Sequence, residues 1–509
     1  MQHHPYNRFL SLLLAALLIG SMLLSCGESK TNTDAASSDL QAADGEGVSA
    51  EEVIAADEEE TVLKDMVPDT LSYDGATIRI FVSNGSGQNE EMYAGQGELT
   101  GDVENDAVIQ RNMTAEERLD ITLEYIGDPT GSWDTIASIL SKFIMAGDTT
   151  YDMYLGNEYG HVNLIALGGL KNVNELEYID WDKPWWNVNY MDEMMIGNDA
   201  RYFLAGDYII ETVRMAHTLF FNKNFYQDAF GNPEELYDLV LDGTWTIDKL
   251  SSVAEAAYVD LNNNGQSDVE DRLGYVTYLA AASVDPFAYL GDVPYSTHDA
   301  DGNIVLNLMS DQAVTLGEKV VSFFHQPGSV FQMGSNVSGT VFKEGRSLFL
   351  GLQSLGTAKW YRDMEDDYGF LPYPKLDETQ RAYHSLVADN ALIGSIPSAS
   401  LNLDKIGAVL EVLASETWRT VMPAWYETSL KIKYSRDNIA AQIIDLIHDS
   451  TTTNFIYAYS NPLSGTGQIM REMVANNSTD YASAVARKEK VAKKSLERLV
   501  AAYEKNFAP

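Results

Sequence analysis

The alternation of apolar and polar residues predicts the folded elements of the first part of the chain. Residues 76–83 alternate as a strand does and end at an Asn-Gly-Ser-Gly segment. The pattern that follows predicts a helix over 105–119, a strand over 121–126, a helix over 133–145 and a strand over 151–155. Because alternating strands and helices form parallel sheets covered by helices, the fold class is α/β.

The later part of the chain is mixed. Thr246 is placed to cap a helix that runs to residue 258. A turn at 299–303 precedes an apolar run and predicts a hairpin. The other predicted elements are a strand at 218–222, an extended segment at 369–374 and a long helix at 481–507.

The first 26 residues carry a targeting pattern. An apolar run from Phe9 to Leu24, too short to span a bilayer comfortably, is followed by Ser25 and by Cys26, the only cysteine of the chain. Leu23–Cys26 resembles the lipobox of bacterial lipoproteins, which implies that residues 1–25 are a signal peptide and that Cys26 is acylated with palmitate-type chains. A plain secretory signal is the alternative. With one cysteine, no intramolecular disulfide can form.

Residues 26–70 differ in composition from the rest. Between Gly27 and Met66 stand twelve Asp and Glu residues against Lys30 and Lys64, with no aromatic residue. This composition predicts a disordered acidic linker that precedes a body beginning near residue 71.

The net charge of −41 argues against nucleic acid as a partner, and against membrane contact other than through the lipid anchor. The helix at 481–507 is rich in Lys and Arg, but Glu489 and Glu497 interrupt them, which favours a solvated face.

Six short segments, in this order and spacing, resemble the extracellular solute-binding proteins of family 1, the maltose-binding-like lipoproteins of ABC importers. The segments are Leu167–Leu170, Leu219–Asn224, Gly243–Thr246, Val341–Leu348, Tyr368–Lys375 and Met422–Tyr426.

The resemblance implies a two-lobed periplasmic-binding-protein-like fold with a cleft between the lobes. One lobe would comprise 71–210 plus 346–395, and the other 211–345 plus 396–509. The protein would be a monomer without enzymatic activity on the extracellular face of the cell membrane. It would capture an oligosaccharide or sugar derivative and deliver it to the permease subunits of an ABC transporter.

Sugar sites combine aromatic faces with polar side chains, so several residues are candidates for ligand contact. Trp185 and Trp186 lie in the densest aromatic cluster, for which core packing is the alternative. Asn84, Asn157 and Glu158 follow strands, at the strand ends where α/β proteins bind ligands. The remaining candidates are Arg214, Asp389, Asn390, Trp425 and Tyr426.

The segment 260–271 has the oxygen spacing of an EF-hand or dockerin calcium loop. Gly265 occupies the sharp-turn position, and Asp271 replaces the usual Glu at position 12. The predicted ligands of a structural calcium ion are Asp260, Asn262, Asn264, Asp268, Asp271 and the Gln266 carbonyl. The alternative is a metal-free surface turn.

Two other functions stay open at this point. The sequence has no Gly-x-Ser-x-Gly, His-Glu-x-x-His, phosphate-loop or dinucleotide motif, but a glycoside hydrolase needs only two carboxylates, which no short motif reveals. A surface polysaccharide-binding protein is the other alternative, although a dockerin would carry two calcium loops and the chain shows one.

Overall fold

A computed structural model describes residues 63–83, 93–95, 98–128, 135–197, 199–278, 282–333, 335–426 and 438–507. The residues from Leu63 onward form one compact unit. The predicted signal peptide, Cys26 and most of the predicted linker lie outside the described residues. None of the described helices is long and apolar enough to cross a membrane.

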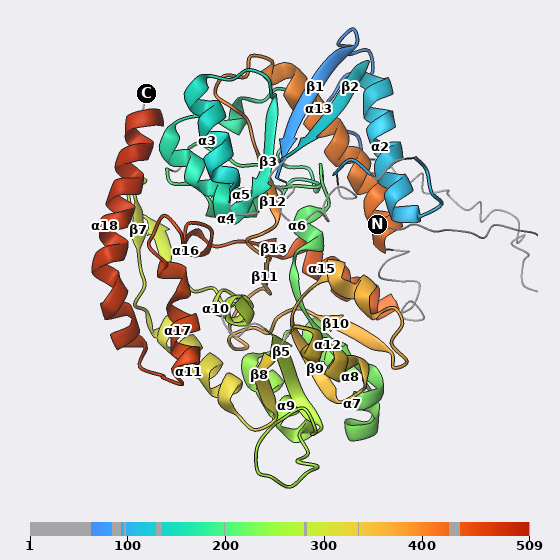
Figure 1. Cartoon of the computed structure of the whole chain (residues 1–509), viewed down its shortest axis with the longest axis vertical. Coiled ribbons are helices and arrows are strands. Elements are labelled where there is room, and N and C mark those ends of the chain that lie inside the picture. The colour runs from blue at the N-terminus through green and yellow to red at the C-terminus, as the bar shows by residue number, and fades with distance from the viewer. Residues whose placement is uncertain are drawn as a thin grey trace, which may run out of the picture. The chain divides into compact units, whose positions relative to one another are not determined.

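The first sheet has four strands in the order β12-β3-β1-β2 (Figure 1). β1 (Ala76–Val82) is parallel to β2 (Ile121–Gly127) and to β3 (Met153–Asn157), as the alternating pattern predicted. β12 (Leu392–Ser395) returns from far along the chain and pairs antiparallel with β3.

Helices α2 (Val103–Leu119), α3 (Ile136–Ala146) and α13 (Leu403–Glu416) accompany this sheet. α2 begins where the Asp102 carboxylate accepts the Asn105 amide. α13 buries an unbroken run from residue 406 to 415, and it contacts both α2 and the apolar side chains of β1 and β3.

The second sheet has five strands in the order β10-β4-β9-β5-β8. β5 is parallel to β8 and β9, whereas β4 is antiparallel to β9 and β10. The strands are β4 (His217–Asn222), β5 (Leu273–Tyr278), β8 (Ser329–Met333), β9 (Ser347–Ser354) and β10 (Tyr368–Leu371). The helices around this sheet are α7 (Lys223–Phe230), α8 (Glu235–Leu241), α9 (Ile247–Ala257), α11 (Asp311–His325) and α12 (Ser335–Lys343).

The strand pairing corrects the expected division of the chain. The resemblance places residues 346–395 in the first lobe, but β9 and β10 pair with β4 and β5 of the second sheet. The resemblance places residues 396–509 in the second lobe, but α13 packs on α2 and meets side chains of β1 and β3 in the first sheet. All eight residues of β9 are buried, which is typical of a central strand. The sequence of such a strand fits the centre of either sheet, and only pairing with β4 and β5 shows that it belongs to the second.

Three segments connect the two sheets. Leu204 bridges to Gly394 of β12, and the chain then passes through α6 (Glu211–Arg214) into β4. The return segment runs through β11 (Ser385–Leu386), and the Ala388 amide donates to the Met215 carbonyl at 3.1 Å beside the first segment. The third segment contains β13 (Thr451–Thr452), which pairs parallel with β11.

Several local predictions are confirmed. The Thr246 hydroxyl caps α9 by accepting the Lys249 amide at 3.3 Å. The turn predicted at 299–303 joins β6 (Ser296–His298) to β7 (Ile304–Leu306) in an antiparallel hairpin. Other elements of this part of the chain are α4 (Glu158–His161), η1 (Val162–Leu167), η2 (Val173–Glu175), α5 (Val188–Glu193), η3 (Ala282–Val284), α10 (Asp285–Ala288) and η4 (Leu355–Tyr361).

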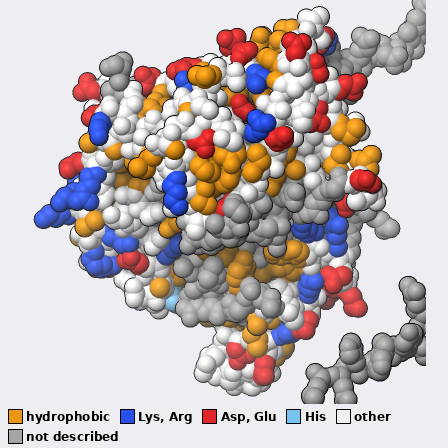
Figure 2. All heavy atoms as spheres, turned by 45° about the horizontal axis from the view of Figure 1, so that its top comes forward, with side chains coloured by type: hydrophobic (Ala, Val, Ile, Leu, Met, Phe, Trp, Pro, Cys, Tyr) orange, Lys and Arg blue, Asp and Glu red, His pale blue; other side chains and the backbone are white. Residues whose placement is uncertain are grey.

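The C-terminal part ends in the predicted long helix, α18 (Tyr481–Phe507). α18 contacts η1 after the first sheet, and it also contacts α11 and α17 (Ile469–Ala475). Figure 2 shows Lys and Arg side chains gathered along the left edge, the side on which Figure 1 places α18. The other elements here are η5 (Thr417–Val421), α14 (Met422–Trp425), α15 (Asn438–Asp449), α16 (Phe455–Ala458), η7 (Thr466–Gln468) and α17 (Ile469–Ala475).

Candidate functional site

A pocket of about 650 Å³ lies at the carboxyl ends of two parallel strands of the second sheet. Tyr278 ends β5, and Gln353 is the penultimate residue of β9. Ligands of α/β proteins bind beyond such strand ends, and pockets of this size accept small solutes. The described lining residues are Tyr278, Gly339, Thr340, Lys343, Gln353, Trp360 and Tyr361.

Trp360 is the exposed aromatic residue of this pocket. It stands in η4, directly after β9, and half of its surface (52%) is accessible to solvent. Its neighbour Tyr361 is buried and packs edge-on against Phe220 and Phe342. The packed tyrosine holds this end of η4 in place, which leaves the Trp360 indole as a hydrophobic surface for a ligand.

The polar groups of the pocket are held by neighbouring side chains. The amide oxygen of Gln353 accepts the Thr357 hydroxyl at 3.0 Å and the Tyr361 hydroxyl at 3.4 Å. Its amide nitrogen donates to the Gly351 carbonyl at 3.3 Å. Such contacts fix a side chain before a ligand arrives, which lowers the entropy lost on binding.

The positive charge at the pocket is already neutralised. Lys343 in α12 donates to the Asp363 carboxylate at 2.7 Å, and its ammonium lies 5.7 Å from the ring centroid of Tyr361. Asp363 is not itself among the described lining residues, and these include no Asp or Glu. The described lining is therefore aromatic and polar, with little net charge.

Sequence reasoning did not select Trp360. The density of aromatic residues pointed to the cluster around Trp185 instead, although a Trp-Tyr pair six residues after a buried strand was a usable signal. The strand-end argument that selects Asn157 and Glu158 in the first sheet holds equally for the ends of β5 and β9 in the second.

The structure buries the predicted tryptophan platform. Trp185 has no exposed surface and packs 6.1 Å from the Trp418 ring. Trp186 is 5% exposed, and its indole N–H donates to the Glu411 carboxylate at 2.8 Å. Core packing, the alternative weighed from the sequence, describes both residues, because neither presents a face to a solute.

Three other predicted residues meet behind the end of β3. Asn157 caps α4 by accepting the Gly160 amide at 2.9 Å. The Glu158 amide donates to the Ala391 carbonyl at 3.0 Å, and the Tyr159 amide to the Asp389 carbonyl at 2.9 Å. These backbone bonds bring the first sheet and the return segment together, as expected for residues near the connection between lobes.

The Glu158 side chain is closed off from solvent. Its carboxylate accepts the hydroxyls of Tyr190 and Thr453, the latter at 3.2 Å. Burial raises the pKa of Glu158 to about 8, and the hydrogen bond from Tyr190 opposes that rise. A carboxyl group with these two partners and no exposed surface ties together α4, α5 and the segment after β13, and it is not open to a ligand.

A second buried acid lies nearby. Asp285, at the start of α10, accepts the Arg471 guanidinium through both oxygens, one of them at 2.6 Å. Burial raises the pKa of Asp285 to about 7 although Arg471 opposes it, and burial also raises the pKa of Asp389. Asn390, beside Asp389, is exposed.

The remaining predicted residues do not join the pocket. Arg214 is 8% exposed and pairs with Glu211 at 3.4 Å within α6. Trp425 is 2% exposed and lies 5.6 Å from the Tyr426 ring. Tyr426 is half-buried and meets the His448 ring at 6.5 Å, edge to face. Asn84 lies outside the described residues.

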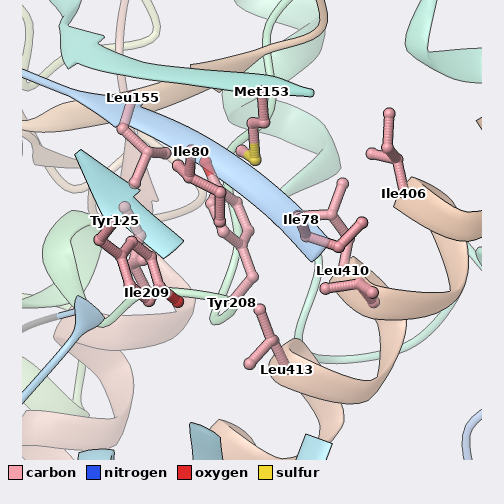
Figure 3. A pocket seen from close by; sticks show the side chains of 11 residues that line it. Ile78, Ile80, Tyr125, Met153, Leu155, Tyr208, Ile209, Ile406, Leu410 and Leu413 are labelled. Atoms are coloured by element: carbon pink, nitrogen blue, oxygen red, sulfur yellow. The ribbon is translucent and has the colours of Figure 1, made fainter. Parts of the chain in front are cut away.

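A smaller cavity of about 10 Å³ lies beneath α13 (Figure 3). Figure 3 shows side chains of β1, β3 and α13 around it, together with Tyr125 and Tyr208. It holds no more than about one water molecule, so it is a packing defect of the core.

The predicted calcium loop folds as a compact turn. Gly265 has φ +73°, and its amide donates to Asp260 at 2.9 Å. The other Asp260 oxygen is buried and has no hydrogen-bond partner in the described part of the chain. Asp271 is buried and accepts the Leu261 amide at 3.0 Å and the Asp268 amide at 3.1 Å.

The side-chain amides of this loop turn to Asp268 in the structure. Asn264 donates to it at 2.7 Å and Asn262 at 3.2 Å. Within the described residues, no group of three or more His, Cys, Asp or Glu side chains is arranged to hold a metal ion. The Asp260 oxygen without a hydrogen-bond partner could bind a cation. Asn262 and Asn264 would bind the same cation through their side-chain amide oxygens, while their amide nitrogens donate to Asp268.

Comparisons with known proteins show the fold. No protein-family model and no curated protein matches the sequence. Among solved structures, UgpB from Mycobacterium tuberculosis in complex with glycerophosphocholine matches with a TM-score of 0.54 and 15% identity, over 84% of this chain and 100% of its own. A cyclic α-maltosyl-1,6-maltose-binding protein from Arthrobacter globiformis matches with a TM-score of 0.54 and 14% identity, over 83% and 99%.

A third match is a cyclo/maltodextrin-binding protein complexed with maltotetraose, with a TM-score of 0.51 and 12% identity, over 86% of this chain and 98% of that one. At these identities the likeness concerns the fold. The chain therefore has the two-lobed α/β fold of periplasmic solute-binding proteins, as the sequence resemblance implied.

Proposed function

We propose that this protein is the solute-binding receptor of an ABC importer, and that it captures an oligosaccharide or sugar derivative in the pocket at Trp360 for delivery to permease subunits. The observation that carries the proposal is an aromatic and polar pocket of about 650 Å³ on a solute-binding fold. The apolar face of a sugar ring stacks on an indole, while amide and hydroxyl groups bind its hydroxyls.

The pocket chemistry favours a neutral sugar among the ligands that this fold holds. The compared structures carry maltotetraose in one case and glycerophosphocholine in another, so the fold by itself names no ligand. A quaternary ammonium group would gain from a carboxylate beside the aromatic ring, and the described lining has none. A glycoside hydrolase would need a pair of carboxylates across the bond to be cleaved. The described lining of the pocket contains no Asp or Glu, which supports capture of the sugar without turnover.

Replacing Trp360 with Ala should weaken sugar binding about tenfold or more, because the stacking surface is lost. A thermal-shift screen over mono- and oligosaccharides identifies the ligand, and calorimetry then compares the variants. Phe230→Ala, which removes a 37%-exposed aromatic residue of α7 outside the pocket, is the matched control and should leave affinity unchanged. Equal affinity of wild type and Trp360→Ala would remove Trp360 from the site, and release of shortened sugars would favour the hydrolase.

The membrane anchor belongs to the same proposal. A lipidated Cys26 would hold the receptor at the extracellular face of the membrane. Cys26→Ala should move the protein from the membrane fraction into the medium, or leave it unprocessed, as immunoblots of both fractions would show. A processed variant that stays with the membrane after a high-salt wash, which screens electrostatic contacts, would contradict lipidation.

The loop at 260–271 is proposed to bind one structural calcium ion. The buried, unpartnered Asp260 oxygen supports this, and a dissociation constant of about 10⁻⁴ to 10⁻³ M is expected for an extracellular loop with Asp at position 12. Chelation should lower the melting temperature without abolishing sugar binding, and Asp260→Ala should reproduce the effect. Identical melting curves with and without calcium would leave a metal-free turn.

A further inference from the structure

The exposed side of α18 carries a continuous line of cations. Arg487, Lys490, Lys494, Arg498 and Lys505 are all exposed and follow one another at spacings of three, four, four and seven residues. Such spacings place side chains on one face of a helix, and the line extends about 27 Å at 1.5 Å per residue. None of these five side chains forms an ion pair with a carboxylate in the described part of the chain.

The glutamates of α18 do not interrupt this line. Glu489 pairs with Lys493 at 2.7 Å. At 3.6 residues per turn, Glu489, Glu497 and Glu504 fall on one flank of the line, with Glu497 beside its edge at Lys490. The opposite, buried face consists of small and apolar residues such as Val485, Leu496 and Leu499, which pack on the protein. The basic side of α18 is therefore continuous and faces solvent, where the sequence pattern alone favoured an interrupted, solvated face.

The helix dipole does not account for the arrangement. Cations near the carboxyl end of a helix are stabilised by the dipole, but this effect decays within the last turn. It covers Lys505, whereas Arg487 and Lys490 stand in the first half of the helix. In a chain with only 34 Lys and Arg against 75 Asp and Glu, five aligned and unpaired cations point to an anionic partner.

The line has the form of a docking surface and not of a small-ligand site. Small ligands bind in concave pockets, and none of the five cations lines the pocket at Trp360 or the cavity beneath α13. A straight row of cations matches a flat array of phosphate groups, such as the headgroups of anionic phospholipids. We propose that this basic face of α18 docks the protein on the anionic lipid surface of the membrane that carries it.

The net charge of the whole protein does not prevent this contact. At physiological salt the screening length is about 8 Å, so acidic groups on distant faces are largely screened when α18 touches a headgroup layer. The predicted acidic linker of residues 26–70, tethered at Cys26, would hold the protein within reach of the membrane. Such a tether keeps the surface at high local concentration, so weak electrostatic binding suffices to orient the receptor.

This inference is independent of the sugar that the pocket takes, and the tether, itself a proposal, only strengthens it. The test is cosedimentation of the full chain with vesicles of about 30% phosphatidylglycerol in phosphatidylcholine, beside pure phosphatidylcholine vesicles that report the contribution of the apolar segment at 9–24. The test variant is Lys490→Gln/Lys494→Gln/Arg498→Gln. The matched control, Lys64→Gln/Lys142→Gln/Lys249→Gln, removes the same charge from three exposed lysines on other elements.

We expect the test variant to bind phosphatidylglycerol vesicles about tenfold more weakly than wild type at low salt, with the control close to wild type. The difference should fall on adding salt and be absent on phosphatidylcholine. Melting curves show that all three proteins are folded. Equal binding of wild type and test variant, or an equal loss in the control, would overturn the proposal. Binding to soluble long-chain polyphosphate without binding to the vesicles would also overturn it, because the partner would then be a soluble polyanion.

Discussion

Arg471→Met is expected to lower the free energy of unfolding by about 3 kcal/mol, seen as a melting temperature about 3 °C lower for a chain of this size. The Asp285 side chain is 3% exposed, and Arg471 is the one guanidinium that binds it in the described part of the chain. Removing one partner of a buried pair leaves the other charge without compensation in a medium that solvates it poorly.

The loss should depend on pH with a definite sign. Burial already holds the Asp285 pKa at about 7, and without Arg471 it rises further. The folded-state pKa of Asp285 lies above the unfolded value of 3.8. The contribution of Asp285 to stability is therefore fully present below pH 3.8 and is lost as pH rises through the folded-state pKa. The gap between Arg471→Met and wild type should therefore be small at pH 5 and larger at pH 8, by thermal or denaturant unfolding.

The double variant Arg471→Met/Asp285→Asn is the control for this prediction. The double variant also removes the Asp285 carboxylate, which the single variant leaves without a partner. Most of the stability should therefore return, and the pH dependence should disappear. Asp389 also lies in the field of Arg471, and any residual pH dependence of the double variant would be assigned to it. A single variant as stable as wild type at pH 8 would show that water reaches Asp285.

Gly274→Ala is expected to lower the free energy of unfolding by about 3 kcal/mol. Gly274 lies in β5, where a Cβ would overlap the backbone carbonyl of Ala254 in α9. Because the obstacle is backbone and not a flexible side chain, α9 would have to move off the sheet, and overpacking of this kind typically costs about 1–3 kcal/mol or more. Chemical denaturation of the purified variant measures the loss.

Gly291→Ala separates this clash from the general effect of a methyl group. The nearest atom to a Cβ at position 291 is Val293 Cγ2 at 3.4 Å, an ordinary contact, and its φ is not in the left-handed region. Its stability should stay within about 0.5 kcal/mol of wild type. If both glycine variants lose the same stability, close approach of α9 to β5 is not the cause.

Local sequence determined most secondary structure, because periodicity and capping act over a few residues. The alternation at 76–83 became β1, Thr246 capped α9, and α18 has the predicted bounds. Boundaries moved where no local signal marks them, as at β3, which begins at Met153 and runs to Asn157 instead of covering 151–155. The two-lobed fold followed from the resemblance in short segments and not from periodicity.

Only the tertiary structure decided sheet membership and exposure. The apolar run of β9 suits any central strand, and long-range pairing with β4 and β5 placed it in the second sheet. Trp185 and Trp360 are the same residue type in aromatic surroundings, yet one has no exposed surface and the other has 52%. A side chain's solvent exposure depends on elements that pack over it from distant parts of the chain, and no short window of sequence contains them.

The same distinction holds for the charged residues. The sequence by itself determined that α18 is a helix and that its cations recur at helical spacing, because both are local properties. The packing of α18 against η1, α11 and α17 decided which side of the helix meets solvent. The exposed cations therefore lie on one face, although Glu489 and Glu497 stand between them in the sequence. That choice depends on which face buries more apolar surface, which is a property of the whole fold.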